Sequence, residues 1–116
     1  MPVRNEAAYI ERSLGAVLAQ DYPAERLEIL VVDGLSTDGT REMVGRMARP
    51  PRVRLLDNPA GIVPPGLNIG IAQARGEIVV RVDGHCEIAP DYVRHCVAHL
   101  LAGHEGTPID AVGGPI

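Results

Sequence analysis

Two aspartates that follow apolar runs are the residues of this chain best suited to chemistry. Asp33 follows the run 27–32, and Asp83 follows the run 78–82. A carboxylate in such a position can accept hydrogen bonds from a ligand N–H group or hold a hard cation through its oxygens. His85 stands two residues after Asp83. Because side chains at positions i and i+2 of extended backbone share a side, Asp83 and His85 are expected to approach one ion.

The elements that position these acids alternate between a helical and a strand rhythm, which is typical of parallel α/β architecture. The apolar periodicity predicts helices over 7–20, 43–47, 64–75 and 90–102, the last one stopping at Gly103, and strands over 27–32, 53–56 and 78–82. Residues 110–112 are expected to begin another strand, and Val3 to be the remnant of a first one. Ligands of open α/β sheets bind beyond the carboxyl ends of the strands, where Asp33 and Asp83 lie. The sequence therefore predicts one domain over residues 1–116 with its site at this edge.

The same periodicity assigns side chains to the core. The helices are expected to bury Ile10, Leu14, Val17 and Leu18 in the first, Leu67, Ile71 and Ala74 in the third, and Tyr92, Val93, Cys96, Val97, Leu100 and Leu101 in the last. Asp91 is expected to cap that last helix.

Composition narrows the class of function. The chain has 116 residues, a formal charge of -4 and 46% hydrophobic residues, as one globular domain would. Every one of the 11 cationic residues is arginine, which excludes a P-loop lysine and Schiff-base chemistry. The interspersed charges do not favour a nucleic-acid partner. Two cysteines are too few for a disulfide framework, and no apolar run approaches the roughly 20 residues of a membrane span, so a cytoplasmic chain with reduced thiols is expected.

The two acids together fit the needs of a nucleotide sugar. Asp33 can accept a hydrogen bond from a pyrimidine imide N–H, and the Gly-containing turn 33–39 can turn backbone N–H groups toward ribose or phosphate. A diphosphate leaving group also needs a cation, which Asp83 and His85 can hold. Gly84 between them leaves room for close approach of a ligand.

Several ordered motifs resemble the family 2 glycosyltransferases of the GT-A fold, over essentially the whole chain. Pro2, Asn5 and Glu6 resemble the family's Pro-x-x-Asn-Glu loop. Asp33 and the run 36–40 resemble its Asp-Asp-Gly-Ser-x-Asp-Gly-Thr motif, with Gly34 where a second Asp is common and Leu35 where Gly is usual. The stretch that leads to the family's metal motif is matched by Asn58, Gly61, Leu67, Asn68, Gly70, Ala74 and Gly76-Glu77. Asp83-Gly84-His85 stands where most members carry Asp-x-Asp, a departure that resembles the succinoglycan-type exopolysaccharide branch.

The resemblance implies a Rossmann-like nucleotide-diphospho-sugar transferase fold that is incomplete, because the first strand and the C-terminal acceptor part are missing. It implies that a UDP-sugar is transferred with inversion to a saccharide or lipid-linked acceptor in polysaccharide biosynthesis. Donor-binding residues would be Pro2, Asn5, Glu6, Asp33, Ser36, Asp38, Asn68 and Asp83. Asp83 and His85 would hold Mn²⁺ or Mg²⁺, of which a histidine ligand suits Mn²⁺ better.

The resemblance also has consequences for the chain by itself. The catalytic base and acceptor-binding segment would lie beyond it, so the chain is expected to be inactive, and the parent protein would work at the cytoplasmic face of a membrane. Strand edges left open by the missing strand would face a hydrophobic groove, and the chain is expected to fold poorly or associate.

Three other interpretations stay open. The pairs His85-Cys86 and His95-Cys96, with His99, contain ligands for a structural zinc, although no Cys-x-x-Cys is present. A receiver-like signalling domain also has acids at strand ends, but it needs a lysine. A non-catalytic nucleotide-binding α/β domain fits the absence of a base.

Overall fold

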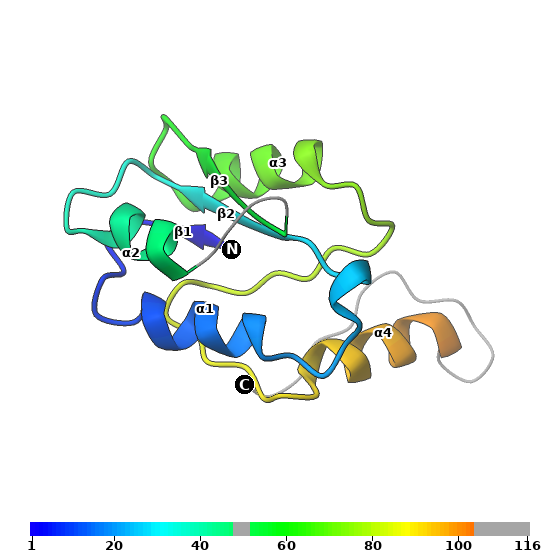
Figure 1. Ribbon diagram of the computed structural model, residues 1–116. Helices are drawn as coiled ribbons and strands as arrows, with labels where there is room; N and C mark the ends of the chain where they lie inside the picture. Colours follow the sequence, from blue (N-terminus) through cyan, green and yellow to red (C-terminus); the bar gives the residue numbers. More distant parts are fainter. Residues whose placement is uncertain (48–51, 104–116) are drawn as a thin grey trace.

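The computed structural model describes residues 1–47 and 52–103 and contains a three-stranded parallel sheet (Figure 1). The strands are β1 (Pro2–Val3), β2 (Ile29–Asp33) and β3 (Val53–Asp57), in the order β1-β2-β3. The register pairs Val3 with Asp33 and Asp33 with Asp57, so the three strands end level with one another. Asp33 is therefore at the carboxyl edge of the sheet, as predicted.

The helices lie to both sides of this sheet. Their bounds are α1 (Ile10–Leu18), α2 (Thr40–Met47), α3 (Val63–Gln73) and α4 (Tyr92–Ala102), with a single 3₁₀ turn, η1, at Ala24–Arg26. Figure 1 shows the sheet between α3 and α1, with α4 displaced toward the far end of α1. α3 has prolines in its first turn and α4 is followed by Gly103 at φ 73°, which matches the predicted start and stop signals. No helix in the described ranges is both long and apolar enough to cross a membrane.

The core forms where α1 and α2 meet β2. Ile10, Leu14 and Val31 are fully buried, and Val44 is nearly so. The last third of the described chain joins the same cluster through Val82, Ile88 and Val93. The predicted apolar stripe of α1 is confirmed, because Ile10, Leu14 and Val17 are buried and Leu18 packs against the cluster.

The predicted strand over 78–82 was wrong for the described residues. Residues 78–82 belong to no strand and pair with none of the three in the sheet. A strand requires a neighbour with free backbone N–H and C=O groups. β1 is the strand at that open edge of the sheet, but it is only two residues long and offers few backbone groups for pairing. The predicted strand over 110–112 lies outside the described residues.

A hydrophobic cavity of about 840 Å³ lies among β2, α3 and residues 78–82. It explains why Ile71, predicted to point inward, is 56% exposed: the side chain lines this unfilled space. Met1 also lines it, and its α-amino group donates to the Leu30 carbonyl oxygen at 2.8 Å. Burial disfavours the charged form and lowers the pKa of this amine to about 6.

The burial predicted for α4 holds only near its start. Val93 is buried and Tyr92 and Val97 pack against the core, whereas Leu101 is 76% exposed. Leu101 lies in the last turn, beyond the part of α4 that reaches the core, so its predicted burial was wrong. Asp91 occupies the N-cap position, but its carboxylate makes no cap hydrogen bond and instead lies 3.0 Å from Nε2 of His95.

Candidate functional site

Two loops meet at the carboxyl edge of the sheet, one after β1 (residues 4–8) and one after β2 (residues 34–40). Hydrogen bonds that join them run from Asn5 N to Ser36 Oγ (2.8 Å), Glu6 N to Thr40 Oγ1 (2.9 Å), Thr37 N to Asn5 Oδ1 (2.9 Å) and Ala7 N to Asp38 Oδ2 (3.0 Å). We call these residues and Asp33 the loop network. It brings together Asn5, Glu6, Asp33, Ser36 and Asp38, all predicted from the sequence to bind a donor.

Asp33 is the buried anchor of the loop network. Its side chain is 0% exposed and accepts hydrogen bonds from the Ser36 backbone N–H at 3.0 Å, from the Ser36 hydroxyl and from Nη1 of Arg41 at 2.8 Å. Arg41 also donates to Oδ1 of Asp57 at the end of β3, 2.7 Å away. These two carboxylates, Asp33 before Asp57, raise the pKa of Arg41 above its ordinary value. A ligand can reach the Asp33 carboxylate only if Ser36 or Arg41 moves.

Asp38 links the loop network to the start of α2. Its Oδ1 accepts from the backbone N–H of Thr40 at 3.1 Å and from the Thr40 hydroxyl. The hydroxyl bond is the largest of several hydrogen bonds that lower the pKa of Asp38 below its ordinary value. Thr40, fully buried, is the first residue of α2, so Asp38 satisfies a backbone donor that the helix leaves unpaired.

Residues 83–86 form a tight turn rather than extended backbone. The Cys86 N–H donates to the Asp83 carbonyl oxygen at 3.0 Å, and the buried Ser13 hydroxyl donates to the Gly84 carbonyl oxygen at 2.7 Å. A Cβ on Gly84 would lie 2.8 Å from Val3 Cγ1 and 2.9 Å from Glu6 Cγ, so only glycine lets the turn pack against β1 and its loop. The predicted i, i+2 geometry was wrong, and the turn itself brings the side chains together.

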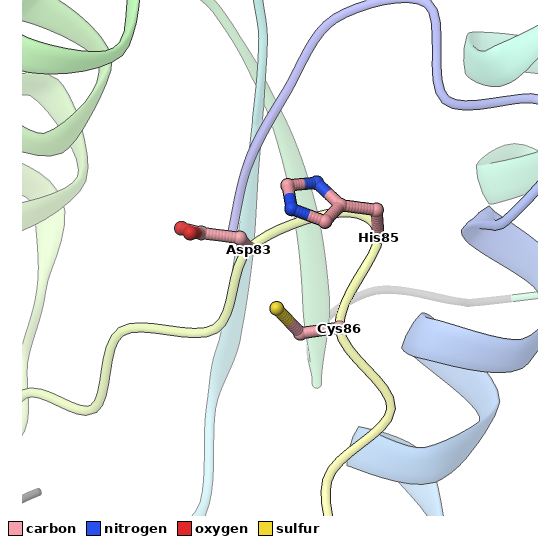
Figure 2. A group of neighbouring side chains, drawn as sticks. All are labelled: Asp83, His85 and Cys86. Atoms are coloured by element: carbon pink, nitrogen blue, oxygen red, sulfur yellow. The ribbon is translucent and has the colours of Figure 1, made fainter. Parts of the chain in front are cut away.

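Three potential metal ligands gather on this turn (Figure 2). One ligand atom from each of Asp83, His85 and Cys86 lies within 4.8 Å of the others. Figure 2 shows the His85 ring and the Cys86 sulfur pointing toward Asp83, whose carboxylate points away from them. We call these three residues the turn cluster. Cys86 was not among the ligands predicted for the donor's cation, although the alternative zinc interpretation included the pair His85-Cys86.

Charged neighbours flank the turn cluster. Oε1 of Glu6 lies 3.4 Å from Nδ1 of His85, and Nε of Arg81 donates to Oδ1 of Asp83 at 2.9 Å. His85 is mostly exposed, whereas the Asp83 side chain is one-third exposed. The cluster therefore combines accessible ligand atoms with an acid positioned behind the imidazole.

A small cleft of about 180 Å³ connects the turn cluster with the end of the sheet, and its lining includes Pro2, Glu6, Asn58, Asp83, Gly84 and His85. Asn58 is 3% exposed, and its Oδ1 has no hydrogen-bond partner within the described chain. A buried amide oxygen without a partner indicates a place for a group that donates a hydrogen bond. Asn58 was not among the predicted donor-binding residues, and only its position in the family-like stretch pointed to it.

Two other family-like positions are explained by local geometry. A Cβ on Gly34 would lie 3.0 Å from the Gly61 carbonyl oxygen, so the second Asp common in the family would require Gly61 to shift. Leu35, where Gly is usual, has φ 60°, a backbone conformation that glycine adopts at lower cost. Asn68 lies on α3 with its side chain exposed and lines neither cavity, so it is not brought to the other predicted site residues.

Of the ligands of the alternative zinc site, His85 and Cys86 lie close together, but in the described residues His95, Cys96 and His99 do not join them. His95 and His99 stack on α4 with ring centroids 6.4 Å apart, and His95 pairs with Asp91. The group of potential metal ligands that lie close together in the described ranges is Asp83, His85 and Cys86. Both cysteines are free thiols.

Comparison with known proteins agrees with the fold and the motifs. The family model for glycosyl transferase family 2 matches residues 1–113. The succinoglycan biosynthesis protein ExoA of Rhizobium meliloti is 35% identical over 105 residues, which is 88% of this chain and 32% of ExoA. This chain also spans only 38% of the length of a second curated relative, the glycosyltransferase AglE of Haloferax volcanii, to which it is 34% identical over 119 residues, 100% of this chain.

Two solved structures are similar in fold. A mannosyltransferase from Pyrobaculum calidifontis in complex with GDP-Man and Mn²⁺ aligns with a TM-score of 0.79 and 38% identity, over 85% of this chain and 30% of that one. TarS from S. aureus in complex with UDP-GlcNAc aligns with a TM-score of 0.74 and 29% identity, over 84% and 28%. With its ordered motifs and parallel GT-A sheet, this chain belongs to glycosyl transferase family 2.

Proposed function

We propose that this chain is the donor-binding part of a metal-dependent, inverting glycosyltransferase that transfers a sugar from a UDP-sugar to a saccharide or lipid-linked acceptor in polysaccharide biosynthesis. The observation that carries the proposal is the cleft where Glu6, Asp83 and His85 converge beside the loop network, at the carboxyl ends of parallel strands. At about 180 Å³ it is smaller than a typical small-molecule site, so it suits part of a donor, such as its diphosphate.

The residues of the loop network would position the nucleotide. Asn5 and Ser36 hold the two loops in register, and Asp33 fixes Ser36 and Arg41. For Asp33 to accept the imide N–H of uracil, Ser36 or Arg41 must give up its hydrogen bond, so we expect the loop to adjust when the donor binds. Pro2, which lines the cleft, and Asp38, in the loop network, stay in the proposal as donor-binding residues, whereas Asn68 lies on α3 outside the cleft. We add Asn58 to them, because its side-chain oxygen can accept a hydrogen bond from a hydroxyl or N–H group of the nucleotide sugar.

Asp83 and His85 would hold the divalent cation. Their carboxylate and imidazole fit Mn²⁺ better than Mg²⁺, which prefers oxygen ligands throughout. When bound, such a cation stabilises the charge that develops on a departing diphosphate. We assign no catalytic base in the described ranges, since Asp91 already pairs with His95. This base and the acceptor site would lie in the rest of the parent protein. The parent protein would work at the cytoplasmic face of the membrane.

The test is calorimetric titration of UDP into the chain with Mn²⁺ and then with EDTA. We expect binding that requires the metal and is lost in Asp83→Ala, because the diphosphate would then lack its cation. Glu87→Ala is the matched control, an exposed acid four residues away that does not line the cleft. Absence of UDP binding in both conditions would refute the assignment. Tighter binding of GDP than of UDP would refute only the choice of uracil as the nucleobase of the donor.

A further inference from the structure

Cys86 gives the turn cluster a chemistry that a carboxylate and an imidazole would not have. Its sulfur lies within 4.8 Å of ligand atoms of both Asp83 and His85. The turn that places it there is fixed by the Cys86 N–H to Asp83 carbonyl bond and by Ser13, so the proximity is built into the backbone. A thiolate is a soft ligand and favours Zn²⁺ over Mg²⁺ or Mn²⁺.

The distances suit a zinc ion after a small adjustment. Zinc binds sulfur at about 2.3 Å and nitrogen or oxygen at about 2.0–2.2 Å, so the ligand atoms of a tetrahedral site are roughly 3.5 Å apart. Reaching this spacing requires the side chains to rotate, above all that of Asp83, whose carboxylate points away from the other two ligands. His85 is mostly exposed and the other two are partly exposed, so rotation about their side-chain bonds is open to them. Three protein ligands leave a fourth position for water.

The neighbours of the cluster also fit a bound cation. Glu6 faces Nδ1 of His85 at 3.4 Å, which orients the ring and leaves Nε2 for a metal. A carboxylate behind a ligating histidine is the usual outer partner in zinc sites. Arg81 opposes the cation electrostatically, but it contacts only Oδ1 of Asp83 and the carboxylate has a second oxygen.

We propose that Asp83, His85 and Cys86 bind Zn²⁺, with the Cys86 thiol releasing its proton to solvent as the zinc–sulfur bond forms. Zinc at this position uses the two residues that the proposed function gives to the donor's cation. If that function holds, Zn²⁺ displaces the cation that the donor needs, and the parent enzyme is inhibited by zinc. The binding of zinc itself does not depend on the nucleotide.

The experiment is a titration of the chain with Co²⁺ in the absence of nucleotide, followed by Zn²⁺. A thiolate ligand gives Co²⁺ a sulfur-to-metal charge-transfer band in the near ultraviolet, and Zn²⁺ should remove it by displacing the cobalt. We expect the band in the unmodified chain and in Cys96→Ser, the matched control on α4, and we expect Cys86→Ser to lose it. Zinc affinity should fall at least 10-fold in Cys86→Ser, and by about 10-fold in Glu6→Gln.

The outcomes separate this inference from the proposed function. Cobalt bound to the unmodified chain without a charge-transfer band would overturn the role of Cys86, and UDP binding with Mn²⁺ would be unaffected. The same holds for a band that survives Cys86→Ser and disappears in Cys96→Ser. A band without any UDP binding would support the zinc site and refute the donor site. Circular dichroism of each variant establishes that loss of the band is not loss of fold.

Discussion

The loop network and the turn cluster each depend on an aspartate that follows an apolar run, yet the two aspartates are used differently. Asp33 is 0% exposed, and its carboxylate is engaged by Ser36 and Arg41. Asp83 is one-third exposed, with Arg81 as its recorded side-chain partner. The same residue type at similar positions thus organises the protein in one place and remains accessible to a ligand in the other. The hydrogen-bond partners of each aspartate, rather than its position in the sequence, decide whether its carboxylate is engaged internally or accessible to a ligand.

Replacing each aspartate with alanine should give the largest difference between the two regions, measured as the loss in the free energy of unfolding. Asp33→Ala leaves Arg41 and Ser36 without their buried acceptor, and we expect the free energy of unfolding to fall by about 2–4 kcal/mol, allowing for the partial exposure of Arg41. Asp83→Ala removes a partly exposed ion pair and should cost less than about 1 kcal/mol. Urea denaturation of both variants measures the difference. Equal losses would mean that Asp33 is not an internal anchor.

A methyl group at Gly84 should damage the turn cluster through packing. Its Cβ would lie under 3.0 Å from Val3 and Glu6, so we expect Gly84→Ala to cost about 1–3 kcal/mol and to weaken Co²⁺ binding. Gly45→Ala is the control, because that glycine lies inside α2 with nothing within 4 Å of an added Cβ. It should stabilise the protein by about 0.5–1 kcal/mol. Thermal unfolding with and without Co²⁺ tests both, and unchanged cobalt affinity in Gly84→Ala would count against the turn as the organiser.

Acid should act on the loop network through Asp38. Its pKa is lowered in the folded state, so the folded state binds fewer protons than the unfolded state in this range. The resulting stability is present above the unfolded pKa of about 4 and is lost as the pH falls through the lower folded value. Unfolding free energies of the chain and of Asp38→Asn, measured from pH 6 to pH 2.5, should therefore converge at the acid end. Parallel curves would show that the Thr40 hydrogen bond does not favour the ionised carboxylate.

The smallest expected effect is a gain in stability when Leu35 is replaced by glycine. This half-exposed residue has φ 60°, where a side chain with a Cβ is strained, so Leu35→Gly should stabilise the protein by about 0.5–1 kcal/mol. Leu35→Ala retains the Cβ and should show no such gain. Thermal denaturation of the two variants measures the difference, and a gain in Leu35→Ala would point to the exposed side chain instead of the backbone.

Local patterns predicted most of the helices and strands, because periodicity and terminal residues are local properties. The buried stripe of α1, the end of β2 at Asp33 and the stop at Gly103 follow from them. The strand predicted over 78–82 failed because strand formation depends on a distant partner. The same limit applies to the site: neither the engagement of Asp33 by Arg41 nor the turn that moves Cys86 beside Asp83 is encoded in spacing.

Residues 78–82 pair with no strand in the described ranges and lie beside the apolar cavity, which would link the stability of the chain to its own concentration if a second molecule covered them. Amide groups without a strand partner exchange their hydrogens with solvent on a short timescale unless another segment covers them. A strand from a second molecule could supply that cover, since open edges are where chains pair. At higher protein concentration, amide exchange at 78–82 would then become slower and the melting temperature would rise together with it. Mass action requires both of any partner that binds only the folded state.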